Sequence, residues 1–341
     1  MYDVFELQKA LSQCAQPPGF EAAQAKLLME YAKPYVDDIQ VDAIGNVICH
    51  RKGPGKKIML PAHMDVIGFM ATHIEENGRI RFCPDGGHWP GRLPGTRVRF
   101  TNGTHGMICP SEKIRTDKET YVSLPIHELY IDIGAGDRAS AEKLVQPGDV
   151  ATFSTETVKT ANGCIITPYA DDLSGCVTLL LAFSQVKEPA NDLYFVFSVQ
   201  EEVGIRGAAA AGYSIEPQVC IAIDGTFTGD NPSKTERNAT VLGKGPTIKV
   251  KDGGQLCNPQ AVNFLRDVAQ KNGVAFQNEV MQGGTTDSSI VQKIRGGAHV
   301  TSVSIPMRNI HTCGEIYSIS DVESGAMLLA KACETPYPYD L

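Results

Sequence analysis

The 341-residue sequence lacks several features that mark non-globular or membrane proteins. It has no stretch of 18 or more apolar residues, which excludes a membrane-spanning helix. Residues 1–10 contain Asp3 and Glu6 and no basic segment ahead of a long apolar run, so we expect no secretory signal. Basic residues number 31 against 39 acidic ones, and the net charge of −8 argues against a nucleic-acid partner.

Two common catalytic and metal-binding patterns are also missing. None of the 10 cysteines forms a C-x-x-C pair, so the spacing does not predict a zinc–thiolate site. Most cysteines stand in apolar runs, as Cys220 does in 219–223, and we interpret them as small buried side chains in a reducing, cytoplasmic compartment. The absence of a G-x-S-x-G motif leaves a Ser–His–Asp hydrolase poorly supported.

Alternating strand-like and helix-like segments fill the two ends of the chain. Helical spacing covers 4–14 and 21–32, and the strand-like segments near the N-terminus are 39–41, 47–50 and 57–62. From about residue 164, continuous apolar runs at 193–200, 219–224 and 299–305 alternate with helical segments, one of them running from Asn258-Pro259 to Gly273. This pattern predicts an α/β domain with a mixed central sheet and helices on both faces.

The middle of the chain has a different character. From about 69 to 162, short β-like runs are separated by turn sequences such as Asp85-Gly86-Gly87 and Asn102-Gly103. We therefore predict that 1–68 and 163–341 form one catalytic domain, and that 69–162 forms a small β-rich domain inserted into it.

Acidic residues or histidine follow the ends of predicted strands in five places. The five segments are Ala62-His63-Met64-Asp65, Tyr169-Ala170-Asp171-Asp172, Val199-Gln200-Glu201-Glu202, Ile223-Asp224-Gly225 and Arg308-Asn309-Ile310-His311. In an open α/β sheet, ligands bind in the crevice beyond the carboxyl ends of the strands. One feature of the fold could therefore bring these scattered side chains together.

Two histidines and three carboxylates from these segments suit Zn²⁺, Co²⁺ or Mn²⁺. A pair of ions needs one bridging carboxylate, and one further carboxylate and one histidine for each ion. Asp171 could bridge, His63 and Asp224 could hold one ion, and the second ion would be left to Glu202 and His311.

The adjacent glutamates at 201 and 202 suit two different tasks. Neighbours in an extended segment point to opposite sides, so one of them can bind metal. If the chain turns there, the other can reach the attacking water as a general base.

Each of these patterns also has a simpler explanation when taken alone. His63 and Asp65 could share a local hydrogen bond, Asp171-Asp172 could be the acidic start of a helix, and Glu201-Glu202 could be surface charge. The remaining histidines lack a partnering pattern, and we interpret them as structural or exposed: His50, His73, His88, His105, His127 and His299.

Five segments of the chain together resemble the dinuclear metallo-aminopeptidase family that comprises the glutamyl and tetrahedral (TET) aminopeptidases, some of which carry the label "cellulase M". The segments that carry the resemblance are Ala62–Gly68, Ala170–Cys176, Gln200-Glu201-Glu202-Val-Gly-Ile-Arg-Gly207-Ala, Gly283-Gly284-Thr285 and Ile305–His311. They follow the family's order, and the flanks match as well, so the resemblance covers nearly the whole chain.

The resemblance implies a role for each residue. It implies that His63 and Asp224 bind one metal ion, that Glu202 and His311 bind the other, and that Asp171 bridges them. It also implies a cis peptide between Asp171 and Asp172, Glu201 as the general base, and Asp65 as the acid that orients His63. Zn²⁺ is the first choice of metal, with Co²⁺ or Mn²⁺ as alternatives.

The sequence departs from the family's usual pattern beside the site. Val66 stands where Glu is usual, Leu173 stands where Arg is usual, and Thr286-Asp287 follows Gly-Gly-Thr where Asp-Ala is usual. None of these changes removes an implied metal ligand or the implied base, but they leave the substrate preference open.

The resemblance implies a metal-dependent aminopeptidase that removes the N-terminal residue from peptides. It also implies that 69–162 is a dimerisation domain and that dimers assemble into dodecamers. Two alternatives remain. One is a glycoside hydrolase, which needs two carboxyls facing each other across the sugar bond, and the other is an assembly-forming binding protein with a decayed site.

Overall fold

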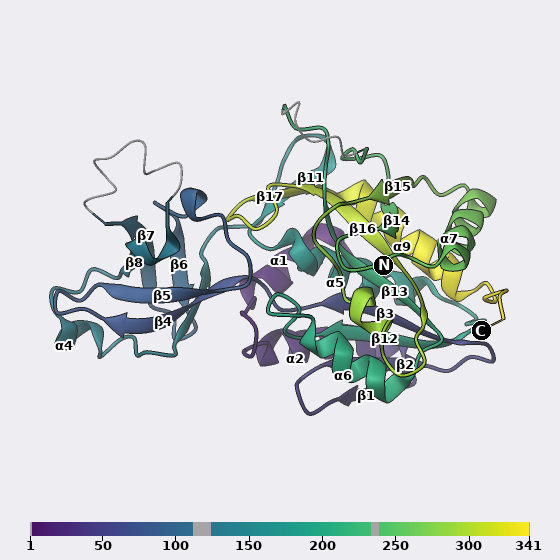
Figure 1. The fold of residues 1–341 in the computed structure, drawn as a ribbon, viewed down its shortest axis with the longest axis horizontal. Helices are drawn as coiled ribbons and strands as arrows, with labels where there is room; N and C mark the ends of the chain where they lie inside the picture. The colour runs from purple at the N-terminus through teal and green to yellow at the C-terminus, as the bar shows by residue number, and fades with distance from the viewer. Residues whose placement is uncertain (1, 112–123, 233–238, 341) are drawn as a thin grey trace.

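The computed structural model describes residues 2–111, 124–232 and 239–340, which form a large mixed sheet with helices and a separate small barrel. The barrel lies at one end of the molecule and the large sheet at the other (Figure 1). The strands of the large sheet are β1 (Asp38–Val41), β2 (Val47–Arg51), β3 (Lys57–His63), β10 (Val158–Lys159), β11 (Cys164–Thr167), β12 (Asp192–Ser198), β13 (Val219–Phe227), β14 (Thr247–Lys251), β15 (Gln277–Val280), β16 (His299–Arg308) and β17 (Glu315–Ser318).

The order of the main path through the large sheet is β1-β2-β12-β3-β13-β16-β17-β11-β10, with β14 and β15 attached beside β16. The four central strands β12, β3, β13 and β16 are parallel, and the strands flanking them are antiparallel. The main helices are α1 (Val4–Gln13), α2 (Ala22–Ala32), α5 (Ala170–Gln185), α6 (Arg206–Ile215), α7 (Pro259–Asn272), α8 (Ser288–Val291) and α9 (Ile319–Cys333).

The two faces of the sheet are buried against different helices. Helices α5 and α9 pack on one face, and α6 and α8 pack on the other. In β3, Ile58 and Leu60 belong to the large core, whereas Met59 between them belongs to the smaller core beneath α6. This alternation explains why the central strands read as continuous apolar runs, and it confirms the predicted mixed α/β fold with helices on both faces.

The predicted ends of helix α7 are also confirmed. The side chain of Asn258 accepts a hydrogen bond from the backbone N–H of Gln260 (2.9 Å), and Pro259 occupies the first turn. Gly273 ends the helix in the left-handed region, with φ +66°.

The inserted segment forms a closed barrel of six strands. These are β4 (Gly68–Ile74), β5 (Ile80–Asp85), β6 (Arg97–Phe100), β7 (His105–Pro110), β8 (Leu129–Asp132) and β9 (Val150–Phe153). The barrel also carries the short helix α4 (Arg138–Ala141). The last barrel strand ends at Phe153, and β10 pairs with β11 of the large sheet, so the chain rejoins that sheet before the predicted boundary at 162.

The centre of the large sheet opens at the carboxyl ends of its parallel strands. Strands β3 and β13 are paired at Val219↔Ile58 and Cys220↔Met59, and they separate beyond that point. The start of α5 fills this opening, because the backbone N–H of His63 donates to Asp172 Oδ2 (3.2 Å). Among the described residues, no helix is both long and apolar enough to span a bilayer.

Candidate metal centre

His63 is the last residue of β3 and is almost completely buried. Its Nδ1 donates to the carbonyl oxygen of Asp65 (3.0 Å), since a carbonyl can only accept. The neutral ring therefore keeps the lone pair on Nε2, which faces the carboxylates of Asp171 (3.4 Å), Glu201 (3.9 Å) and Asp224 (3.9 Å). A group of acceptors converging in this way fits a cation placed among them.

Asp65 supports the site in a different way from the one that the resemblance implies. Its carboxylate lies 3.7 Å from Nδ1 of His63, and the hydrogen bond to that ring is made by the backbone carbonyl instead. The carboxylate accepts the backbone N–H groups of Glu201 (3.0 Å) and Glu202 (3.1 Å). Asp65 thus fixes the histidine and both glutamates at the same time.

The two glutamates lie in the turn that follows β12. Gln200 has φ +56°, a left-handed conformation that turns the chain away from the strand just before Glu201. Glu201 Oε2 faces His63 Nε2 (3.9 Å), whereas Glu202 Oε1 faces His311 Nε2 (3.4 Å). The neighbouring side chains therefore serve opposite sides of the centre.

Asp171 lies between the two histidines. Its Oδ1 is 3.4 Å from His63 Nε2, and its Oδ2 is 3.4 Å from His311 Nε2. Ligand atoms about 2.0–2.1 Å from one tetrahedral ion are about 3.3 Å apart, so each oxygen is placed to share an ion with one histidine. The peptide between Asp171 and Asp172 is cis, as the resemblance implies.

Two observations show that this donor set fits divalent metal. Asp171 Oδ1 is buried and finds no hydrogen-bond partner among the residues that the structure describes. The ligand atoms of His63, Asp171 and Glu202 lie within 4.8 Å of one another, and those of His63, Asp172 and Asp224 do so as well. Asp172 is already engaged by the backbone N–H groups of His63 and Gly175, so Asp171 is the better placed bridge.

In the absence of metal, the carboxylates around Asp171 concentrate negative charge, and this charge shifts the pKa values of the neighbouring histidines and of Glu201. Burial opposes the charged form of His311, but Asp171 and Glu202 outweigh it and raise the pKa of His311 to about 11. The pKa of His63 is also raised, since Asp171, Glu201 and Asp65 outweigh its burial. Burial, together with the nearby Asp224 and Glu202, raises the pKa of Glu201 despite the opposing effect of His63.

Glu315, the first residue of β17, is a part of the site that sequence reasoning missed. It is buried, and its two oxygens accept the backbone N–H groups of Asp171 (2.9 Å) and His311 (2.7 Å). It therefore ties two ligand segments that are 140 residues apart in the chain. No local pattern around Glu315 signals this role, because its partners come from β11–α5 and from the turn after β16.

The barrel also contributes to the site, through the loop that follows β5. Trp89 Nε1 donates to the carbonyl oxygen of Ile310 (3.2 Å), and His88 stacks on Phe69 with ring centroids 4.5 Å apart. A Cβ added at Gly87 would lie 2.9 Å from Nδ1 of His311. This loop therefore holds the His311 turn in place and leaves no room for a side chain at position 87.

We expect Gly87→Ala to displace His311 and to weaken metal binding by roughly 10–100-fold, the cost typical of disturbing the support of a ligand. Calorimetric titration of metal-free protein measures this, and the fluorescence of Trp89, the single tryptophan, reports the movement of the turn. Gly136→Ala is the matched control, since a Cβ there meets nothing within 4 Å. Equal metal affinity in the two variants would contradict the positioning role.

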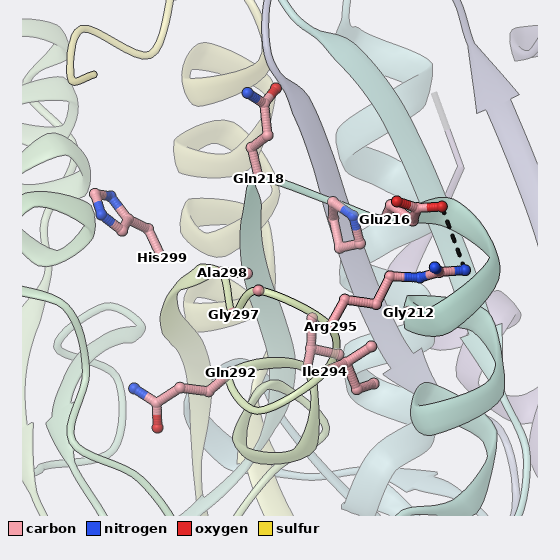
Figure 2. Close-up of a pocket in the computed structure, with 12 residues that line it drawn as sticks. Gly212, Glu216, Gln218, Gln292, Ile294, Arg295, Gly297, Ala298 and His299 are labelled. Carbon is pink, nitrogen blue, oxygen red and sulfur yellow. Dashed lines mark ion pairs between the residues drawn. The ribbon is translucent and has the colours of Figure 1, made fainter. Parts of the chain in front are cut away.

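A second cavity, of about 510 Å³, lies at the opposite ends of the central strands, where β13 and β16 begin. Figure 2 shows Arg295 turned toward Glu216, with which it forms an ion pair (3.3 Å). His299 on another side of this cavity is bonded through Nδ1 to the hydroxyl of Tyr337 (2.8 Å). These polar groups are already partnered, so this cavity does not present the converging free acceptors of the centre at His63.

Converging carboxylates and histidines at the carboxyl ends of a mixed α/β sheet define a metal-dependent hydrolase.

Comparisons with known proteins identify the family. The model of the M42 glutamyl aminopeptidase family matches residues 45–328. A putative aminopeptidase of Acetivibrio thermocellus is 39% identical over 97% of this chain and 98% of its own. The lysyl aminopeptidase of Pyrococcus furiosus is 33% identical over 98% of both chains. The solved TET1 peptidase of Pyrococcus horikoshii is 30% identical over 97% of this chain and 99% of its own, with a TM-score of 0.86.

The chain belongs to the M42 glutamyl aminopeptidase family, and it is an aminopeptidase. This confirms the resemblance drawn from the five sequence motifs. The family is metal-dependent, in agreement with the cluster of carboxylates and histidines around Asp171.

Proposed function

We propose that the protein uses two divalent metal ions to remove the N-terminal residue from peptides. Zn²⁺ is the preferred choice of metal, and Co²⁺ and Mn²⁺ are the alternatives. His63 and Asp224 would hold one ion, Glu202 and His311 the other, and Asp171 would bridge them. The observation that carries this proposal is the placement of the two Asp171 oxygens, each 3.4 Å from a different histidine.

When bound, the ions would supply Lewis-acid charge to polarise the scissile carbonyl and to make the attacking water more acidic. Glu201 would accept a proton from that water and pass it to the leaving amine nitrogen. Its place supports this role, because Oε2 faces the His63 side of the centre while Asp65 holds its backbone. The site lies in a cavity of about 340 Å³, which would admit the end of a peptide chain.

The arrangement does not favour the two alternative functions. A glycosidase needs two carboxyls facing each other across a sugar bond, whereas Glu201 and Glu202 each face a different histidine. A decayed site would have lost ligands, whereas the sequence retains all five proposed ones. Family membership also favours the aminopeptidase.

The proposed function is tested by removing metal with a chelator and restoring Zn²⁺, Co²⁺ or Mn²⁺ one at a time. Hydrolysis of a panel of aminoacyl-nitroanilides should disappear with the metal and return with it. An N-acetylated substrate is the control, because it lacks the free amine that defines an aminopeptidase substrate. Activity that survives complete metal removal, or that acts equally on the acetylated substrate, would refute the proposal.

Metal affinity should rise with pH. His63 and His311 must lose their protons to bind metal, and the surrounding carboxylates raise both pKa values in the metal-free protein. We expect the affinity for Co²⁺ to fall about tenfold per pH unit for each proton displaced, as pH is lowered from 8 to 6. Calorimetric titration at three pH values measures this, and an affinity independent of pH would contradict the ligand assignment.

We also propose that the protein is a cytoplasmic homo-oligomer and that the barrel domain is its dimerisation module. Ten free thiols suit a reducing compartment. The Pyrococcus horikoshii relative assembles into a tetrahedron or a large octahedral shell, which supports dodecamers built from dimers here.

Light scattering at micromolar concentration should give a mass of two or twelve times 36.8 kDa. A stable assembly is expected because a shell of this kind needs closed, repeated contacts between copies. A monomer at this concentration would contradict the assembly proposal and leave the proposal for the metal centre intact.

A further inference from the structure

Two polar side chains at the start of α2, Glu21 and Gln24, are buried and form hydrogen bonds outside their own helix. Glu21 occupies the N-cap position of α2, but its side chain makes no capping bond there. It is 5% exposed, and Gln24 in the first turn is fully buried. Buried polar groups need hydrogen-bond partners, so both side chains must find theirs beyond the helix.

Glu21 bonds to a turn that lies far away in the sequence. Its Oε1 accepts the backbone N–H of Gly19 (2.9 Å) and that of Gln200 (3.2 Å), which is 179 residues further along the chain. No described lysine, arginine or histidine forms an ion pair with this carboxylate. The two backbone N–H groups are therefore what stabilises the buried oxygen.

Gln200 is the residue directly before the proposed base. Its φ of +56° is left-handed, a strained conformation that a residue other than glycine keeps only when its neighbours hold it. Its carbonyl oxygen accepts the backbone N–H of Arg206 (3.2 Å), and its own N–H is held by Glu21. The side chain of Glu21 thus fixes the turn from which the side chain of Glu201 projects.

The segment that carries Glu21 is itself anchored to the end of β3. Gln24 Nε2 donates to the carbonyl oxygen of Met64, and the carbonyl oxygen of Gln16 accepts the backbone N–H of Val66 (3.2 Å). These two contacts flank Asp65, whose carboxylate holds the backbone of both glutamates. The start of α2 therefore holds the histidine turn and the glutamate turn in one fixed relation.

We propose that Glu21 is a positioning residue for the reaction, and that its bond to Gln200 places the carboxylate of Glu201 where it can accept the proton of the attacking water. A general base must lie within hydrogen-bonding reach of that proton, and a small misplacement costs much of the rate. Glu21 does not line the cavity over the centre, so it acts through the backbone and not on the substrate. The inference rests on the proposed function, because it assumes that Glu201 is the base.

The test separates the reach of the side chain from its charge. Glu21→Ala should lower kcat by about 10- to 100-fold and leave KM and metal content unchanged. Glu21→Gln should keep kcat within about threefold of the native value, because an amide oxygen in the same place still accepts both N–H groups. Glu21→Asp keeps the charge but is one methylene too short, so its kcat should fall below that of Glu21→Gln. If Glu21 acted through its charge, the order of these two variants would be reversed.

Glu30→Ala is the matched control, because Glu30 lies on the exposed side of the same helix, and its kcat should stay native. Native kcat in Glu21→Ala, or loss of metal along with activity, would overturn the inference. If Glu21→Ala fails to fold, the order of Glu21→Gln and Glu21→Asp decides. Full turnover in Glu201→Gln would instead refute the proposed function, whatever the variants at Glu21 show.

Discussion

Glu201→Gln should lower kcat by at least about 10²-fold while the protein keeps its metal. Glutamine retains the shape of the side chain and the backbone bond to Asp65, but it cannot accept a proton. Glu202→Gln should behave differently and lose metal affinity, because Glu202 faces His311 and not the His63 side of the centre. The contrast between adjacent residues separates the base from the ligand.

Turnover of a nitroanilide and metal content by elemental analysis measure the two effects on the same samples. Glu323→Gln, on the exposed face of α9, is a matched control that should keep both activity and metal. Near-normal turnover in Glu201→Gln, or loss of its metal, would show that Glu201 is not the base.

Asp171→Asn should reduce metal binding more than the roughly 10–100-fold lost when an outer partner is removed, and activity should fall with it. The carboxylate faces both histidines, so replacing it removes charge from both proposed ion sites at once. Asp172→Asn is the informative comparison. Asp172 accepts the backbone N–H of His63 at Oδ2 and that of Gly175 at Oδ1, so the single oxygen of asparagine keeps one of these bonds and loses the other.

Calorimetric titration with Zn²⁺ distinguishes the two aspartates. Asp172→Asn should weaken metal binding less than Asp171→Asn does, since Asp172 holds the start of α5 against β3 and one of its two bonds survives. A greater loss of metal affinity in Asp172→Asn than in Asp171→Asn would show that Asp171 is not the bridging ligand.

The sequence predicted the fold class, and it pointed to the residues of the proposed metal centre, because both inferences depend on local patterns. Apolar runs of strand length ended directly at His63 and Glu201, and the ends of parallel strands meet at one edge of a sheet. The separation of β3 from β13 then gives these side chains a place to converge. Such patterns are visible in a single sequence.

The supports of the site could not be predicted in the same way. Glu315 joins two ligand segments from a separate strand, and Trp89 reaches the His311 turn from the barrel. Each role depends on a contact between distant parts of the chain, which no spacing in the sequence encodes.

The end of the inserted domain also depends on a contact between strands that local sequence does not specify. Turn-rich, strand-like sequence continues to 162, but β10 pairs with the large sheet from 158. The sequence pattern of a strand is the same in either sheet, and the partner strand alone decides where it belongs.

Anomalous diffraction from crystals grown with Zn²⁺ tests the central claim most directly. The account predicts two peaks, one on each side of Asp171. The first should lie about 2.0–2.2 Å from His63 Nε2 and Asp224, and the second at the same distance from Glu202 and His311 Nε2, with Glu201 bound to neither. A single peak, or a peak bound by Asp172 in place of Asp171, would contradict it.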